Sequence, residues 1–158
     1  MTASVKAKAG KGVFVVLGIF SALFILPGIF IALTKAEGWQ LLAVECASFA
    51  IPWAGALSVR FRYDEKEISY HSLFRHFSVW TEEVRGIEIG VERTQHVPQG
   101  APRFYLVLRD GRRQMLNARI LPPSVVRAFC AMLVRRGVSV QVADAYMAKR
   151  FASQIFTE

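Results

Sequence analysis

The side chains that could do chemistry are few in this chain of 158 residues, and they do not form a known catalytic pattern. His71 and His76 lie five residues apart, which would place them on opposite faces of a regular strand, and His96 stands alone in a predicted loop. Cys46 and Cys130 lack the spacing of metal ligands and are expected to be buried apolar side chains. We find no glycine-rich phosphate loop, nucleophile elbow or CxxC motif. The sequence predicts no catalytic, metal or cofactor site, and therefore a non-enzymatic protein.

Glu45 is the one ionisable side chain within the two apolar segments that open the chain, residues 13–33 and 39–57. Each segment has about the 20 residues needed to cross a hydrocarbon core of about 30 Å. A carboxylate at that depth is a candidate functional group, because its charge is costly away from water. It could serve proton transfer or transport, contact a partner or Ser48, or be tolerated near the surface. The two segments hold no second carboxylate or histidine to complete a proton relay.

Basic residues flank the apolar segments and predict their orientation. Three lysines precede the first segment and two arginines follow the second: Lys6, Lys8, Lys11, Arg60 and Arg62. The positive-inside rule then places both chain ends in the cytoplasm, as a multi-pass protein of the bacterial inner membrane. The first run is too long for the hydrophobic part of a cleaved signal peptide. We expect a basic cytoplasmic tail over residues 1–11 and transmembrane helices over 12–34 and 39–58.

Small residues recur at helical spacing in both predicted spans. They are Gly18, Ala22, Gly28, Ala32, Ala43, Ala47, Ala50 and Ala54. Such patterns let helix backbones approach closely in lipid, either within a hairpin or with other membrane proteins. We therefore take Glu45, Gly28, Ala43 and Ala47 as candidate intramembrane contacts. A proline in each span is expected to kink its helix.

After residue 57 the pattern changes to the alternation typical of half-buried strands. Six strands are predicted, over residues 57–63, 68–71, 77–80, 86–92, 104–108 and 114–116. Residues 95–102 are predicted to be a loop, and Asp110 with Gly111 is a strong hairpin-turn signal. A proline-led amphipathic helix follows, ending at Gly137. The fold class expected is a membrane helical hairpin plus an α+β head, a small antiparallel β-barrel capped by the helix.

The head resembles the bacterial pleckstrin-homology-like (PH-like) domains, including the YcxB-like group, of small membrane proteins with a two-span hairpin. The similar segments are YDEKEISY, VWTEEVRGIEI, LRDGRR and the closing helix. The resemblance implies a partly open barrel of about seven strands over residues 59–137. Members that bind phosphoinositides carry Lys and Arg on the first hairpin. Here residues 64–67 read Asp-Glu-Lys-Glu, which argues against inositol-phosphate binding at that hairpin.

The net charge of +8 indicates a basic surface. This surface either contacts anionic lipid or is simply exposed to water. A Lys or Arg near an anionic membrane contributes about 1 kcal/mol of attraction. The candidate headgroup contacts are two pairs, Arg112 with Arg113 and Arg135 with Arg136. Nucleic acid is not predicted as a partner, because no basic stripe interleaved with aromatic residues occurs.

Residues 138–158 are predicted to be an extension with a short strand and an amphipathic helix. Met147, Phe151 and Ile155 recur at steps of four and are candidate partner-binding residues. This helix could dock on the head, lie in the membrane interface or meet a partner. The function expected is an accessory or regulatory subunit of a membrane complex, with other membrane proteins or copies of itself as partners. The alternatives are a sensor of anionic lipid headgroups and a toxin-immunity protein.

Overall fold

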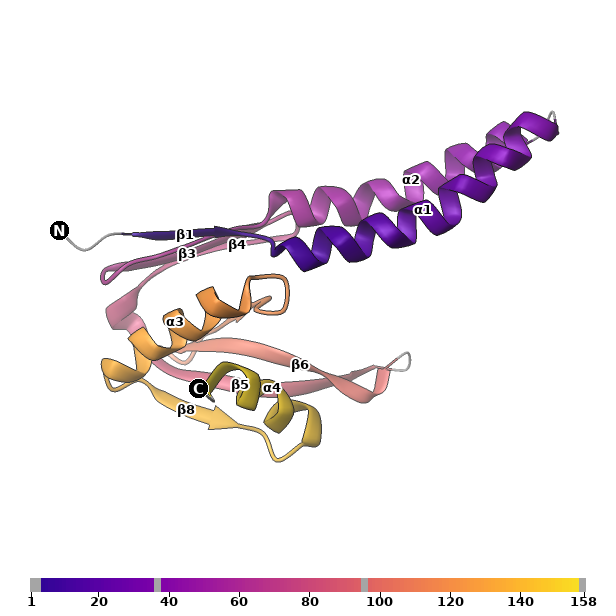
Figure 1. The fold of residues 1–158 in the computed structure, drawn as a ribbon. Helices are drawn as coiled ribbons and strands as arrows, with labels where there is room; N and C mark the ends of the chain where they lie inside the picture. The colour runs from indigo at the N-terminus through magenta and orange to yellow at the C-terminus, as the bar shows by residue number, and fades with distance from the viewer. Residues whose placement is uncertain (1–3, 36–37, 95–96, 157–158) are drawn as a thin grey trace.

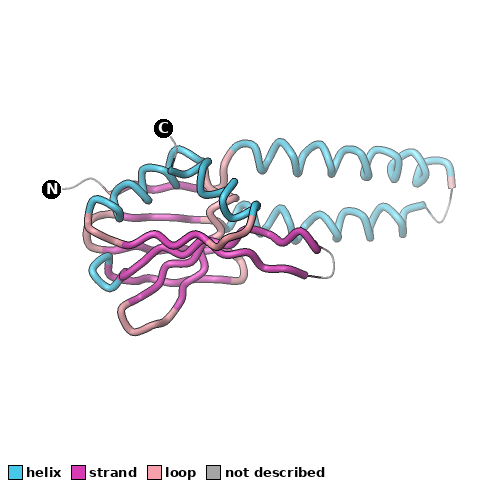
Figure 2. Tube along the Cα trace, turned by 90° about the horizontal axis from the view of Figure 1, so that it is seen from below, coloured by secondary structure: helices cyan, strands magenta, loops and turns pink. Residues whose placement is uncertain are grey.

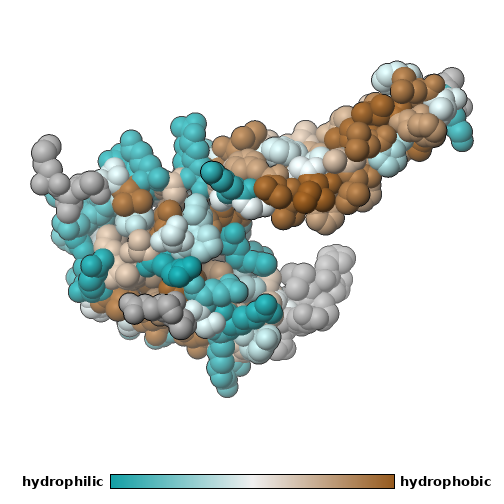
Figure 3. Space-filling view, viewed as in Figure 1, coloured by the Kyte–Doolittle hydropathy of each residue, from teal (hydrophilic) through white to brown (hydrophobic). Residues whose placement is uncertain are grey.

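The computed structural model describes residues 4–35, 38–94 and 97–156, and it consists of a long helical hairpin joined to a head (Figure 1). The hairpin is formed by α1 (Lys11–Thr34) and α2 (Gly38–Ser58). Both helices are long and apolar enough to cross a membrane. They run side by side out of the head (Figure 2), and Figure 3 shows their hydrophobic surface beside the hydrophilic surface of the head. The sequence prediction of two apolar helices is confirmed.

The two helices pack on each other through a mixture of aromatic and polar contacts. The Trp53 indole N–H donates to the Ser21 hydroxyl, with 3.0 Å between nitrogen and oxygen. The rings of Phe24 and Phe49 lie 5.9 Å apart between centroids. Both helices continue through an internal proline, and the hairpin is bent rather than straight (Figure 1).

The first sheet of the head has four antiparallel strands in the order β1-β2-β3-β4. They are β1 (Val5–Lys8), β2 (Arg60–Tyr63), β3 (Glu67–Ser72) and β4 (Arg75–Trp80). Strand β1 leads into α1 and β2 follows α2, so both helices of the hairpin join the same sheet. Four residues of the segment predicted to be a basic tail, Val5–Lys8, therefore form a strand. Four residues of alternating Val, Lys and Ala are too few to predict a strand from the sequence pattern. They form a strand here because they pair with β2.

The second sheet has the order β7-β6-β5-β8. Its strands are β5 (Val84–Thr94), β6 (Val97–Leu108), β7 (Arg113–Leu116) and β8 (Ser139–Val142), with β8 parallel to β5. Strand β6 includes most of the predicted loop. Pro102 lies in β6 opposite Val91 of β5, at a position beyond the pairing with β7, which begins at Phe104. The expected small antiparallel barrel is not confirmed: the described strands form two four-stranded sheets and no closed barrel.

Two helices complete the α+β head, with a 3-10 turn, η1 (Thr81–Glu83), linking the sheets. Helix α3 (Pro123–Arg135) lies between the two sheets (Figure 1). Its Phe129 ring stands nearly perpendicular to the Phe61 ring, with 5.1 Å between the ring centroids. The helix ends before Gly137, whose φ of +79° favours glycine. Helix α4 (Tyr146–Phe156) docks on the head and buries Ile155 in the core. The extension is therefore part of the head.

Candidate functional site

The first sheet separates an apolar inner face from a polar outer face, as the two-residue period of a strand requires. In β2, Phe61 and Tyr63 are buried in the core, while Arg60 and Arg62 are exposed. Strand β1 follows the same period, so Lys6 and Lys8 point outward. The outer face thus collects cations from the two strands that connect to the helical hairpin.

The register of β1 and β2 places these cations directly opposite one another. Lys8 pairs with Arg60 and Lys6 pairs with Arg62. Like charges at directly opposed positions destabilise a sheet. We call these four residues the basic face. Its charges carry a local cost to folding that a bound anion would remove.

Within the described parts of the chain, three of the four cations on the basic face have no carboxylate at ion-pair distance. Only Arg62 has one, with 3.8 Å between its Nη2 and Asp64 Oδ2. The basic face borders an open groove of about 850 Å³. The groove is lined by the first sheet alone, without α3 or the second sheet, so it opens on the outer face. The basic face therefore carries positive charge that, among the described residues, is largely without neighbouring carboxylates.

The two histidines of the first sheet extend the row of cations nearest the helices. His71 lies opposite Arg60 on one side and opposite His76 on the other, and the two imidazole rings are 6.5 Å apart. The sequence prediction of opposite faces was wrong, because the chain reverses after Ser72 and returns in β4. Among the described residues, no group of three His, Cys, Asp or Glu side chains could share a metal ion. Position 96, the third histidine, lies outside the described residues.

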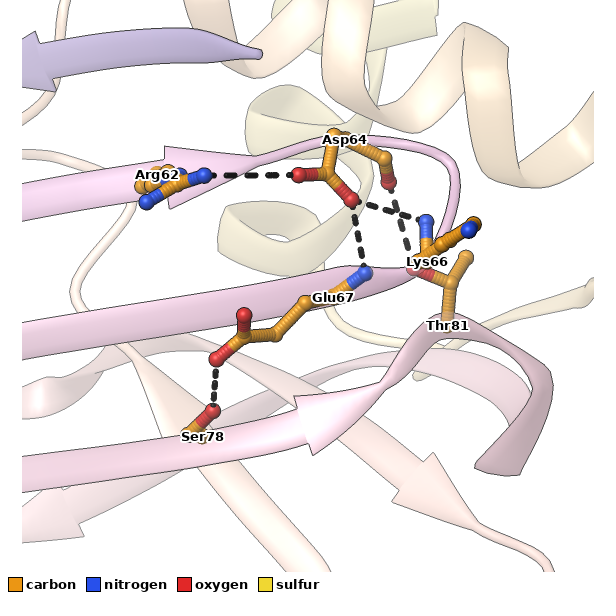
Figure 4. Close-up of polar contacts among 6 residues, drawn as sticks. All are labelled: Arg62, Asp64, Lys66, Glu67, Ser78 and Thr81. Carbon is orange, nitrogen blue, oxygen red and sulfur yellow. Dashed lines mark hydrogen bonds and ion pairs between the residues drawn. The ribbon is translucent and has the colours of Figure 1, made fainter. Parts of the chain in front are cut away.

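The acidic turn between β2 and β3 has a structural role (Figure 4). Asp64 Oδ1 accepts hydrogen bonds from the backbone N–H groups of Lys66 and Glu67, each at 2.8 Å. These two bonds hold the pKa of the Asp64 carboxyl below its usual value, and the bond from Glu67 has the larger effect. Thr81 donates to the Asp64 carbonyl oxygen, and Ser78 donates to Glu67. The turn lies at the end of the sheet remote from the helical hairpin, because β2 begins at the hairpin and ends at Tyr63.

The arginines proposed as headgroup contacts at the end of α3 are engaged within the head. Arg136 Nη1 donates to the Glu65 carbonyl oxygen at 2.7 Å, and its Nη2 lies 3.8 Å from Glu65 Oε2. Arg135 Nε donates to the Ala131 carbonyl oxygen at 3.2 Å. Because Glu65 is in the acidic turn, Arg136 lies at the end of the head remote from the hairpin.

Arg112 and Arg113 also pair with carboxylates. Arg112 Nε lies 2.5 Å from Asp110 Oδ2, and Arg113 pairs with Glu88 and covers the Tyr105 ring. The hydrogen bond from the backbone N–H of Arg112 is also the main cause that lowers the pKa of the Asp110 carboxyl. The sequence identified a basic surface but favoured four arginines, of which Arg112, Arg113 and Arg136 are already paired with carboxylates.

Within the hairpin, the structure brings two of the predicted contact residues together. Glu45 lies on the side of α2 that packs on α1, against Gly28, where an added Cβ would overlap its Oε2. Among the described atoms Oε2 is buried and has no hydrogen-bond partner, and Ser48 donates to the Val44 carbonyl instead. Glu45 therefore turns into the hairpin and away from any third helix.

Ala43 and Ala47 face outward on α2, as do Ala50 and Ala54. The row of alanines that the sequence pattern emphasised is thus not the row that packs on α1. Cys46 is also exposed on α2, contrary to expectation, whereas Cys130 is fully buried and burial raises the pKa of its thiol to about 12.

The apolar side of α4 is used by the head itself. Ile155 is buried, and Phe151 is partly buried against the core. Met147 is half-buried. Of the three interpretations left open for this helix, the structure matches docking on the head.

Comparisons with protein-family models, curated proteins and solved structures found no match to this chain. We therefore infer function from the geometry of the chain itself.

The basic face was missed by the sequence analysis because its cations come from two short segments on either side of the hairpin. The signal was present as alternation: Val-Lys-Ala-Lys before the first helix and Arg-Phe-Arg-Tyr after the second.

Proposed function

We propose that this chain is a two-span membrane protein whose head binds anionic lipid headgroups on its basic face. Two pairs of opposed cations carry the proposal, Lys8 with Arg60 and Lys6 with Arg62. Among the described residues, these cations lack neutralising carboxylates apart from the 3.8 Å contact of Arg62. Phosphate-bearing headgroups supply the missing negative charge, and they occur at the surface of the membrane in which the hairpin would lie.

The position of the basic face supports this choice of ligand. Arg60 is two residues beyond the end of α2, and Lys8 is three residues before the start of α1. The row that they form is therefore held close to the membrane surface by both spans. Arg136, in contrast, is bound to the acidic turn about 17 Å further along the sheet, which exceeds the screening length of about 8 Å at physiological salt.

The orientation is part of the same proposal. Lysines and arginines flank both ends of the hairpin on the side of the head, and such residues are retained in the cytoplasm. We place the head and both chain ends in the cytoplasm of a bacterium, on the inner membrane. We also propose kinship with the PH-like membrane proteins, with the ligand bound on a sheet face instead of at the acidic first hairpin. The proposed function has no catalytic step.

The test uses the full chain in nanodiscs of phosphatidylcholine with a minor share of phosphatidylglycerol. Native mass spectrometry counts the phosphatidylglycerol that the protein retains as salt rises. The double variant Lys8→Gln with Arg60→Gln should lose about 2 kcal/mol of attraction, or about 30-fold in affinity. The matched control, Arg112→Gln with Arg113→Gln, removes the same charge and should retain the lipid. Equal retention by the two double variants would contradict the proposal.

A second candidate is assembly with another membrane protein as an accessory or regulatory subunit. One observation favours it: the alanines of α2 at positions 43, 47, 50 and 54 are exposed and form a smooth row on the outside of the hairpin. Small residues of this kind allow close packing of another span. Ala47→Leu should then reduce stoichiometric co-purification with a partner in mild detergent, whereas Leu41→Ala, on another exposed position of the same helix, should not.

A further inference from the structure

We infer that the two-residue turn between β3 and β4, formed by Leu73 and Phe74, inserts into the same membrane beside the helical hairpin. The inserted turn would be a third attachment point, which fixes the tilt of the head on the bilayer. This inference rests on the membrane placement in the proposed function, but it does not depend on anionic lipid.

The composition of this turn has no explanation within the head. Two-residue hairpin turns usually contain Gly, Asn, Asp or Pro. Here the turn presents two large apolar side chains, with Leu73 45% and Phe74 80% exposed. Exposing an aromatic ring to water is unfavourable, and large apolar side chains at a loop tip are typical of contact sites.

The position of the turn identifies what would cover it. Leu73 and Phe74 line an apolar groove of about 370 Å³ together with Ile51, Pro52 and Gly55 of α2. Figure 1 shows the end of β3 and β4 beside the base of the hairpin. The turn thus shares a surface with residues that we place in the membrane.

The depth follows from helix geometry. Helix α2 has 21 residues and is therefore about 31 Å long, close to the thickness of the hydrocarbon core. Gly55 and Ile51 lie about 5 and 10 Å from its Ser58 end. A turn beside them lies in the outer part of the hydrocarbon, which is the depth at which the apolar faces of interfacial helices are buried.

The polar residues around the turn fit the same placement. Arg75 directly follows Phe74, and His76 and His71 form the next cross-strand pair. These side chains would then lie at the level of the headgroups, in one row with Arg60. Along the first sheet, the apolar turn is followed by the cations at headgroup level and then by the acidic turn at the far end. This is the order expected for a sheet that points away from a bilayer surface.

Site-directed spin labelling tests this inference in the full-length protein. Phe74→Cys and Trp80→Cys are made separately in a Cys46→Ala background and reconstituted in vesicles of phosphatidylcholine alone. Trp80 is the matched control, because it is an exposed aromatic residue at the other end of the same strand. Ile51→Cys, exposed on α2, supplies the reference for a position in the hydrocarbon.

We expect the label at position 74 to be accessible to oxygen and protected from a water-soluble nickel reagent, as at position 51. The label at position 80 should be accessible to the nickel reagent. If position 74 is as accessible to nickel as position 80, the inference is wrong. Because the vesicles carry no anionic lipid, this result stands apart from the retention of phosphatidylglycerol, and each proposal can fail alone. Leu73→Cys gives an independent second measurement if Phe74→Cys does not fold.

Discussion

Replacing Gly38 by alanine should open the helical hairpin at its loop end. Gly38 is the first residue of α2 and is packed against the last turn of α1. A Cβ at this position would lie 2.5 Å from both the Ala32 Cα and the Ile31 carbonyl oxygen, and 2.6 Å from the Ala32 nitrogen. Ordinary contacts to carbon begin near 3.4 Å, so the overlap is about 0.9 Å. All three atoms are backbone, and no side-chain rotation can relieve the overlap.

The magnitude follows from the rigidity of those neighbours. Overpacking in well-packed regions costs about 1–3 kcal/mol, and contact with backbone places Gly38→Ala in the upper part of that range. Alanine is favoured over glycine by up to about 1 kcal/mol inside a helix, but the first position benefits little. We expect a net loss of about 2 kcal/mol, or about 30-fold in the folded-to-unfolded ratio.

The control is Gly55→Ala, in the same helix, where an added Cβ meets nothing within 4 Å. This variant should be unchanged or up to about 1 kcal/mol more stable. Unfolding by SDS in mixed micelles can be followed by the emission of Trp53, which donates to Ser21 across the hairpin, after Trp39 and Trp80 are replaced by Phe. If Gly38→Ala unfolds at the same SDS fraction as Gly55→Ala, the helices do not approach as closely as described.

Two further outcomes follow from pKa shifts in the head. The folded-state pKa of Asp64 is lowered, so its contribution to stability is complete above the unfolded value of about 3.9 and is lost as pH falls through the folded value. Asp64→Asn should therefore flatten the loss of unfolding free energy on acidification below about pH 4, measured by urea titration, and an unchanged acid slope would exclude this role. Because burial raises the pKa of the Cys130 thiol to about 12, a water-soluble maleimide should not modify it at about pH 8 in a Cys46→Ala background until the head unfolds. Rapid labelling of the native protein, detected by mass spectrometry, would show that the α3 core opens.

The helices and most of the strands could be predicted because their signals are local. The expected spans at 12–34 and 39–58 agree with α1 and α2 within a residue. The amphipathic helix before Gly137 and the strands of the hairpin turn at Asp110 were also predicted from periodicity and turn residues. In each case the pattern within one segment is enough to predict the structure. The spacing of apolar residues along that segment shows whether one face or every face is buried.

The predictions that failed concern pairing between distant segments. Strand β1 was not predicted, and it forms beside β2. The short strand expected in the extension is present as β8, but its parallel pairing with β5 is visible only in the tertiary structure. His71 and His76 share a face because the strand reverses between them. The candidate arginines were basic in sequence, but Asp110, Glu88 and Glu65 compensate three of them in space.

The sequence by itself determined that this protein has a two-helix apolar hairpin with a basic flank and a mixed α+β head, since composition over about 20 residues is enough to specify an apolar helix. The tertiary structure alone decided which cations lie side by side. Lys8 and Arg60 lie on opposite sides of the hairpin in sequence, and the antiparallel register of β1 and β2 makes them direct neighbours. Cross-strand neighbours depend on register, which no single segment encodes. The basic face is for that reason a property of the fold.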